Sequence, residues 1–148
     1  MRDEPLWSIW EQDVAERTAG KVVKASGMTE LFKADVKTDK YLIDCKYTET
    51  DSYRLSLTMW EKICSWATNE SREPVVAVRI EKGNRTPYEC AVLPEYIYCK
   101  LFHVDTSMVE VHEMRSHKIV NKPAVEIFQI GNHRLVSLPF ERFENACR

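Results

Sequence analysis

The chain has 148 residues, with 21 Lys and Arg against 23 Asp and Glu, a formal net charge of −2 and a pI near 6.1. An apolar content of 44% and a charged content of 30% are typical of a soluble globular domain and exclude a disordered chain. The charge balance excludes a strongly basic nucleic-acid-binding domain, but it does not exclude nucleic acid as a partner.

Cysteine usage and the first residues point to a compartment. The five cysteines are odd in number and form no CxxC pair, which supports neither a disulfide framework nor a zinc ribbon. The segment 1–5 lacks an apolar signal core, and no apolar run approaches the roughly 18 residues of a membrane span. We therefore expect a cytoplasmic protein without a standard secretion signal or a membrane-spanning segment.

Apolar periodicity predicts alternating helices and strands up to residue 102. Trp7, Trp10 and Val14 recur at helical spacing, and Gly20 follows as a C-terminal stop. A capping box, 58–61, is expected to open the second helix. The expected elements are a helix at 8–19, strands at 21–24 and 41–48, a helix from 58, strands at 74–80 and 88–93, and a helix at 94–102.

The chain after Phe102 is predicted to be rich in strands, with a hairpin turn at Gly131-Asn132. The complete order predicts an α/β, or mixed α+β, sheet with helices packed against it. We expect a core domain at 1–104 and a C-terminal extension at 105–148 packed on that core. The expected elements of this part are strands at 109–111, 119–120, 125–130 and 135–138, and a helix at 139–147.

Asp35, Asp44 and Lys46 lie on one expected β-hairpin. Asp44 and Lys46 share a strand face, because alternate side chains of a strand point the same way. Converging carboxylates form the hard oxygen site that Mg²⁺ and Mn²⁺ prefer, and such an ion can activate a water for phosphodiester hydrolysis. The alternative interpretation is a solvated strand face with a weak salt bridge.

The order of these elements and motifs resembles the PD-(D/E)xK nuclease superfamily and, within it, the archaeal-type and phage-encoded Holliday junction resolvases. The likeness extends over about residues 8–100. Ala34 replaces the Pro or Gly of the motif, and Asp44 replaces the more frequent Glu, but neither change removes a required functional group. The matching positions are Glu11, Ser26-Gly27, Asp35, the run 43–48 and the apolar strand 74–80.

This resemblance implies an αββαββα core of the restriction-endonuclease-like type and a homodimeric, metal-dependent endonuclease for branched DNA. It implies that Asp35 and Asp44 bind Mg²⁺ or Mn²⁺, that Lys46 is the catalytic lysine and that Glu11 is the acid from the first helix. Glu16 remains the alternative for that acid. The residues expected to contact DNA, or else to form a turn and a solvated basic face, are Lys24, Ser26, Lys33, Lys37 and Arg54.

Two other functions stay open. The same site serves repair, recombination and restriction nucleases, and the motif does not choose among their DNA substrates. A non-catalytic DNA-binding or assembly module with the nuclease fold is the third hypothesis. Trp7, Trp10, Trp60 and Trp66 lie on helical stripes, which favours a place in the core or in an interface over base stacking.

Overall fold

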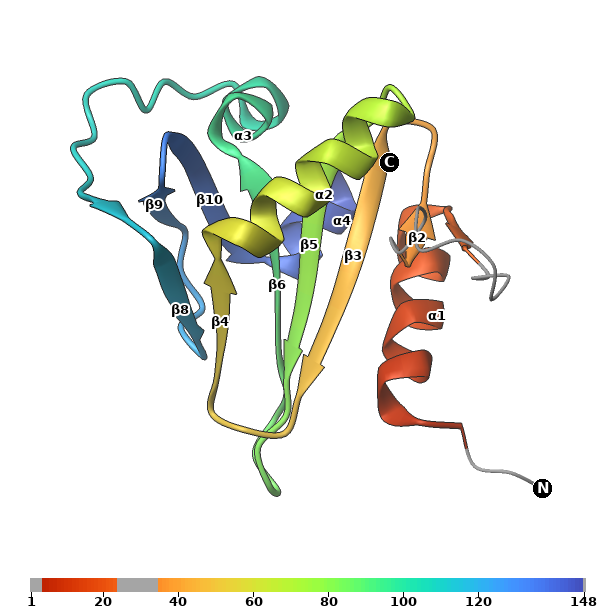
Figure 1. Ribbon diagram of the computed structural model, residues 1–148. Helices are drawn as coiled ribbons and strands as arrows, with labels where there is room; N and C mark the ends of the chain where they lie inside the picture. The colour runs from red at the N-terminus through yellow and green to blue at the C-terminus, as the bar shows by residue number, and fades with distance from the viewer. Residues whose placement is uncertain (1–3, 24–34, 148) are drawn as a thin grey trace.

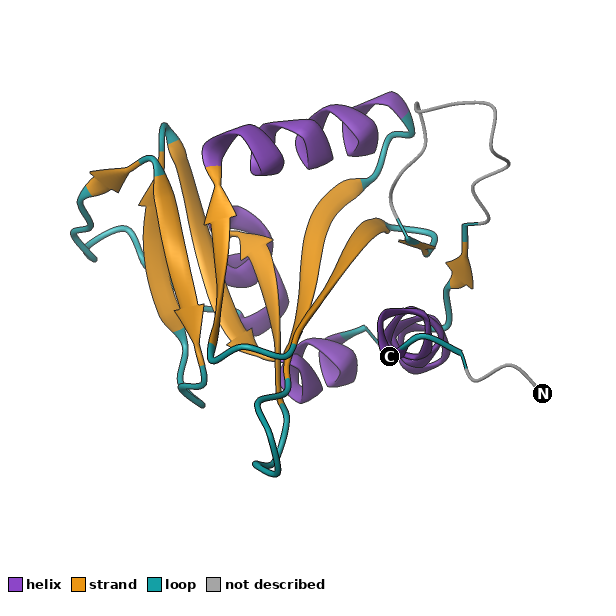
Figure 2. Cartoon of the chain, turned by 60° about the horizontal axis from the view of Figure 1, so that its bottom comes forward, coloured by secondary structure: helices purple, strands orange, loops and turns teal. Residues whose placement is uncertain are grey.

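The computed structural model of the protein describes residues 4–23 and 35–147 (Figure 1). Within these ranges the chain forms a large mixed sheet with helices on both faces, which confirms the expected α/β class (Figure 2). The helices are α1 (Leu6–Thr18), α2 (Leu57–Asn69), α3 (Glu95–Phe102) and α4 (Phe140–Ala146). The strands are β1 (Lys21–Val22), β2 (Val36–Lys37), β3 (Tyr41–Thr48), β4 (Ser52–Ser56), β5 (Glu73–Ile80), β6 (Tyr88–Pro94), β7 (Glu113–Met114), β8 (Ser116–Val120), β9 (Glu126–Ile130) and β10 (His133–Pro139).

The main sheet has eight strands in the order β1-β2-β3-β5-β6-β10-β9-β7. β3 and β5 are parallel, as are β7 and β9, and the other neighbours are antiparallel. A parallel pair needs a crossover connection, and β4 with α2 provides it between β3 and β5. Within this crossover, β4 pairs with β8 to form a separate two-stranded sheet.

The main sheet separates two hydrophobic cores. On one face, α1, α3 and α4 pack over the sheet around Trp10, Phe140 and Phe143. On the other face, α2 and the β4–β8 pair enclose a second core that contains Trp60 and Leu55 (Figure 2). Burial on both faces accounts for the continuous apolar runs of β5 and β6, which lack the alternation of a half-exposed strand.

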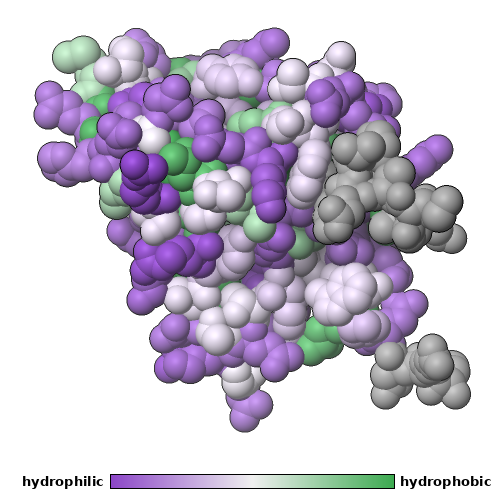
Figure 3. Space-filling model, in the orientation of Figure 1, coloured by the Kyte–Doolittle hydropathy of each residue, from purple (hydrophilic) through white to green (hydrophobic). Residues whose placement is uncertain are grey.

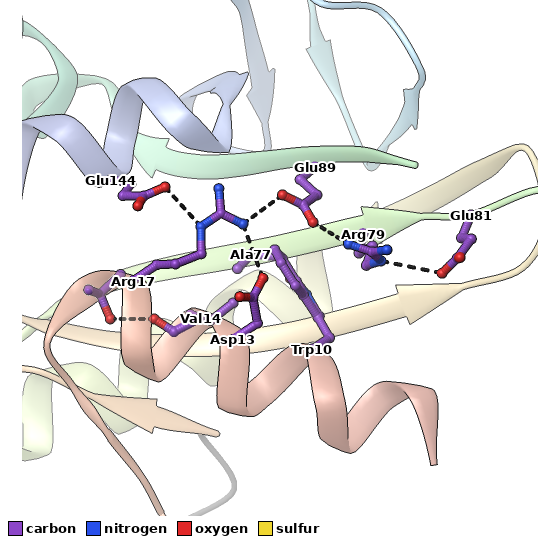
Figure 4. A network of polar contacts seen from close by, with 10 residues as sticks. Trp10, Asp13, Val14, Arg17, Ala77, Arg79, Glu81, Glu89 and Glu144 are labelled. Carbon is purple, nitrogen blue, oxygen red and sulfur yellow. Dashed lines mark hydrogen bonds and ion pairs between the residues drawn. The ribbon is translucent and has the colours of Figure 1, made fainter. Parts of the chain in front are cut away.

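Polar contacts fix α1 on the sheet (Figure 4). The indole Nε1 of Trp10 donates a hydrogen bond to the backbone oxygen of Ala77 in β5, at 3.1 Å. About two turns further along α1, the Arg17 guanidinium donates to Glu89 at 2.7 Å and to Glu144 at 2.8 Å. These contacts set the position and the rotation of α1, and hence the direction in which its remaining side chains point.

The end of α1 differs by one residue from the predicted stop at Gly20. Ala19 takes the left-handed conformation, with φ of 57°, and closes the helix after Thr18. Gly20 serves another purpose, because a Cβ at this position would lie 2.9 Å from the backbone oxygen of Lys37. The absent side chain lets the chain pass close to β2.

Two local predictions were wrong. The expected capping box is not the helix start, because Ser56 caps α2 by accepting a hydrogen bond from the backbone nitrogen of Met59 at 3.1 Å. β4, which we did not predict, ends at this serine. The strand expected at 109–111 is absent, since the Val109 nitrogen closes a turn onto Thr106 and the Val109 oxygen accepts from Arg134.

Residues beyond 104 are interleaved with the rest of the fold. β10 pairs with β6 inside the main sheet, and β8 pairs with β4. Phe140 of α4 lies edge-on to the Trp10 ring, with centroids 5.4 Å apart. This segment therefore completes both cores, and the division into two parts at residue 104 stays a prediction. None of the helices in the described ranges is long and apolar enough to cross a membrane.

Candidate active site

The site lies at the edge of β3, just beyond the short stretch that pairs with β2. β2 is two residues long and pairs with β3 only at Leu42 and Ile43. Further along the same edge, the backbone nitrogen of Cys45 in β3 donates to a side chain and not to a strand. Its acceptor is Asp35 Oδ2, at 2.7 Å. Past Cys45, no other strand of the described ranges pairs with this edge of β3. Side chains from both faces of the sheet can therefore meet there.

A pocket of about 590 Å³ occupies this edge. Its floor comes from the hairpin and its walls come from α1 on one face of the sheet and α2 on the other. The face that carries α2 is largely hydrophilic, with only small hydrophobic patches (Figure 3). The lining residues are Trp7 and Glu11 of α1, Asp35, Asp44, Cys45 and Lys46 of the hairpin, and Met59, Lys62 and Trp66 of α2.

The structure brings Glu11, Asp35, Asp44 and Lys46 together in this pocket. Glu16, the alternative helix acid, is exposed on α1 and does not line the pocket. The chemical roles assigned to these residues stay predictions.

The expected DNA contacts are placed differently. Lys37 forms an ion pair with Glu70 at 2.7 Å, and Arg54 donates to the Ser116 hydroxyl at 2.9 Å. Neither side chain lines the pocket. Lys24, Ser26 and Lys33 lie outside the described residues.

Asp44 is the most deeply buried charged residue of the pocket, with 3% of its surface exposed. The Lys46 Nζ lies 3.1 Å from Asp44 Oδ2, but the two groups are not aligned for a hydrogen bond. Within the described ranges, this oxygen is the one buried side-chain oxygen or nitrogen without a hydrogen-bond partner. Such an atom costs stability unless a further group binds it.

Burial and crowding of like charges perturb both aspartates. Burial raises the pKa of Asp44 to about 7, with the neighbouring Asp35 adding to the rise and Lys46 opposing it. Burial also raises the pKa of Asp35 to about 7, and a hydrogen bond shared with Glu11 contributes. Burial lowers the pKa of Lys46, but the Asp44 carboxylate outweighs it and the net shift is upward. The pocket thus holds more negative charge than its single floor lysine offsets.

The donor set fits a hard divalent cation. Among the described residues, no three His, Cys, Asp or Glu side chains already form a metal-binding group. The Asp35 and Asp44 carboxylates nevertheless supply the oxygen ligands that Mg²⁺ and Mn²⁺ prefer, and buried Asp44 Oδ2 has an ion pair with Lys46 but no well-aligned hydrogen bond from the described residues. A cation would also offset the burial and the like-charge repulsion that keep their pKa values high.

Several pocket residues escaped prediction from the sequence. Trp10 and Trp60 lie in the core as expected, but Trp7 and Trp66 line the pocket. Tyr53 of β4 lies near enough to Lys46 and Asp44 for their charges to shift its pKa, which burial raises. A signal did exist in α2: the residues Met59, Lys62 and Trp66 form a stripe one position ahead of the core residues Trp60, Ile63 and Ala67.

Comparisons with known proteins give a distant structural likeness. No protein-family model and no curated protein matches the sequence. Among solved structures, the fold is similar to that of Hjc, a Holliday junction resolvase from the archaeal hyperthermophile Archaeoglobus fulgidus. The identity is 14% and the TM-score 0.44, over 76% of this chain and 85% of the resolvase chain.

Proposed function

We propose that this protein is a divalent-metal-dependent endonuclease that hydrolyses DNA phosphodiester bonds, with the four-way junction as its leading substrate. The observation that carries the proposal is Asp44 Oδ2, a buried oxygen that pairs with the Lys46 ammonium at 3.1 Å but accepts no well-aligned hydrogen bond from the described residues. It lies in one pocket with Glu11, Asp35 and Lys46. The spacing of Asp35, Asp44 and Lys46, which resembles the PD-(D/E)xK motif, supports the same chemistry.

Each residue has a distinct role in this proposal. Asp35 and Asp44 would hold Mg²⁺ or Mn²⁺, and Glu11 would bind the same ion directly or through water. When bound, the ion would activate a water and offset the charge that develops on the phosphate. The hydrogen bond from the Cys45 nitrogen fixes the orientation of the Asp35 carboxylate. Asp44 holds the Lys46 ammonium at 3.1 Å, within the pocket.

Lys46 acts on the substrate. Its ammonium donates to a non-bridging oxygen of the scissile phosphate and keeps the attacking water in line with phosphorus. The raised pKa of Lys46 keeps this group protonated at neutral pH. Attack of water breaks the phosphorus–oxygen bond directly, without a covalent intermediate on the protein.

Resolution of a junction requires two cuts, which two copies of the site in a two-fold homodimer would provide. Light scattering of the purified protein, alone and with junction DNA, measures this directly. A protein that stays monomeric on the junction would contradict the dimer and leave the hydrolytic site in place.

The decisive experiment compares labelled four-way, flap, nicked and linear DNA in the presence of Mg²⁺ or Mn²⁺. We expect the four-way junction to be cut fastest, and Lys46→Ala and Asp44→Asn to lose at least about 100-fold in rate. Lys40→Ala, at an exposed position outside the pocket, is the matched control and keeps full activity. Faster cutting of linear DNA would indicate another nuclease of this type. Absence of cutting, or equal rates in all variants, would favour a non-catalytic module.

A further inference from the structure

Two partly exposed tryptophans line the pocket above the acidic floor. Trp7 belongs to α1 and Trp66 to α2, so they approach the pocket from helices on opposite faces of the sheet. Trp7 is 55% exposed, whereas Trp10 on the same helix is 1% exposed. Leu6 and Ile9 of α1 are about half exposed as well, but of these three apolar residues only Trp7 lines this pocket.

The second ring is held in place by the fold. Trp66 packs in part against the cores formed by α2, and its neighbour Ala67 is fully buried. Met59 lies on the same side of α2 and also packs partly against the core. Trp66 therefore presents an ordered aromatic surface to the pocket, at little cost in side-chain entropy on binding.

Two lysines line the same pocket as the tryptophans. Lys62 lies between Met59 and Trp66 on the pocket side of α2 and is exposed to solvent, and Lys46 lies on the floor. A ligand with a flat ring and an anionic group matches this combination, since rings stack on tryptophan and phosphate oxygens accept hydrogen bonds from lysine. A nucleotide has both parts.

The size of the pocket limits how much nucleic acid enters. A volume of about 590 Å³ falls within the usual range for small-molecule sites, which suits one nucleotide and not a base-paired duplex. Bases inside a duplex are stacked on one another and present no free face to a protein ring. The rings can therefore act only on a base that is unpaired or turned out of the helix.

We propose that Trp7 and Trp66 stack on an unpaired nucleotide of the DNA strand and that Lys62 binds its phosphate, beside the site of hydrolysis. The inference rests on the proposed nuclease function and names its substrate class as DNA with unpaired or extruded nucleotides. Flaps and single-stranded segments provide such nucleotides, a four-way junction provides them when a base at its branch point turns out of the stack, and fully paired linear DNA does not.

Tryptophan fluorescence tests the stacking without cleavage. In buffer with EDTA, the protein is titrated with an oligothymidylate of about eight nucleotides and with a blunt, fully paired, GC-rich duplex. Because Trp10 and Trp60 are each 1% exposed, quenching by the oligonucleotide reports on Trp7 and Trp66. We expect strong quenching by the single strand and little by the fully paired duplex.

Variants assign the signal. Trp7→Leu and Trp66→Leu each weaken binding of the single strand by roughly 5- to 100-fold, and Trp7→Phe, which keeps a ring, retains most of it. Ile9→Ala is the matched control, because Ile9 is on the same helix, is 48% exposed and lines a different pocket. Unchanged thermal melting of Trp7→Leu verifies that the loss is not due to unfolding.

The stacking and the nuclease proposals fail separately. Single-strand binding that needs Trp7 and Trp66, in a protein that cuts no DNA, would keep the stacking and overturn the nuclease. Cleavage that proceeds equally in Trp7→Leu and Trp66→Leu, with no quenching by the oligonucleotide, would overturn the stacking alone. Binding of the fully paired duplex as tight as binding of the single strand would overturn the substrate class.

Discussion

Two groups of acidic side chains lie beside α1 and differ in how their oxygens are satisfied. In the first, which we call the Arg17 cluster, every carboxylate accepts a hydrogen bond from a guanidinium (Figure 4). In the second, at the edge of β3, Asp35 accepts from the Cys45 backbone nitrogen, and Asp44 Oδ2 pairs with the Lys46 ammonium but accepts no well-aligned hydrogen bond from the described residues. The Arg17 cluster consists of Asp13, Arg17, Arg79, Glu81, Glu89 and Glu144.

The comparison distinguishes acidic residues that stabilise the fold, in the Arg17 cluster, from acidic residues that are available to bind a ligand, at the edge of β3. Both groups are partly buried and both have more acids than bases, so a count of charges does not distinguish them. Hydrogen-bond geometry does, because guanidinium forks match carboxylates and a single ammonium cannot serve three of them. Groups that are left unsatisfied and have shifted pKa values are typical of functional sites.

The largest effect on stability is expected from the satisfied group. Arg17→Met keeps most of the side-chain volume but removes the three charge-assisted hydrogen bonds that Arg17 donates to Asp13, Glu89 and Glu144, and we expect a loss of about 3 kcal/mol. Urea unfolding measures this loss. Arg142→Met, at an exposed arginine on α4, is the control and costs little. An equally small cost for Arg17→Met would mean that the cluster does not hold α1.

The unsatisfied group should respond in the opposite direction. The pKa of Asp44 rises from 3.8 to about 7 on folding, so the folded protein binds more protons than the unfolded chain in that range and loses stability as the pH rises through it. Asp44→Asn removes this penalty. Without metal, we expect it to stabilise the protein by about 1–3 kcal/mol at a pH of about 8 and by almost nothing near a pH of about 4. Thermal melts of both proteins across pH measure this difference. Destabilisation of Asp44→Asn at the higher pH would contradict the proposed penalty for a charged, buried Asp44.

A bound metal ion should stabilise the acidic group at the edge of β3 by binding its carboxylate oxygens. At a pH of about 8, Mn²⁺ at 100 times its dissociation constant should stabilise the wild type by about 2.7 kcal/mol, because it binds the folded state only. At a pH near 5 protons compete for the same oxygens, and the gain should shrink. Calorimetric titration and melting with Mn²⁺ measure both effects. If Asp44→Asn gained as much as the wild type, the ion would have to bind elsewhere.

The smallest expected effect concerns a single pKa. Glu11→Gln replaces a negative neighbour by an amide that can donate to Asp35, so the pKa of Asp35 should move down from about 7. Carbon-13 NMR of the aspartate carboxyls follows this titration. Glu16→Gln removes the same charge from an exposed position of the same helix and should leave the midpoint unchanged. Equal shifts in both variants would assign the effect to net charge.

The main elements could be predicted from the sequence because their patterns are local. The alternation of 41–48 predicted β3 with Asp44 and Lys46 on one face, and the apolar run at 74–80 predicted β5. The helix start at Ser56 was missed, since two hydroxyl residues lie close together and only the end of β4 decides between them. At 109–111 the apolar residues are held by a turn and by Arg134, which is distant in sequence.

The hairpin residues that form the floor of the pocket could be predicted from the sequence, but the helix residues that form most of its walls could not. Asp35, Asp44 and Lys46 follow a spacing that a motif can capture, and the resemblance to the nuclease superfamily implied Glu11 over Glu16. The place of Trp7 depends on the rotation of α1, which the contacts of Trp10 with Ala77 set. No local pattern contains that information, because Ala77 is 67 residues away.

The position of β10 has a consequence for the order of folding. β10 lies between β6 and β9, so the sheet has an unfilled place beside β6 until residues 133–139 have been synthesised. A nascent chain that has reached only residue 104 presents an open, apolar strand edge, which is prone to pair with other chains. Its pairings also span a long stretch of sequence, which slows folding. The pocket lies beside β3, on the other side of the sheet, and all its lining residues precede residue 104 in the chain.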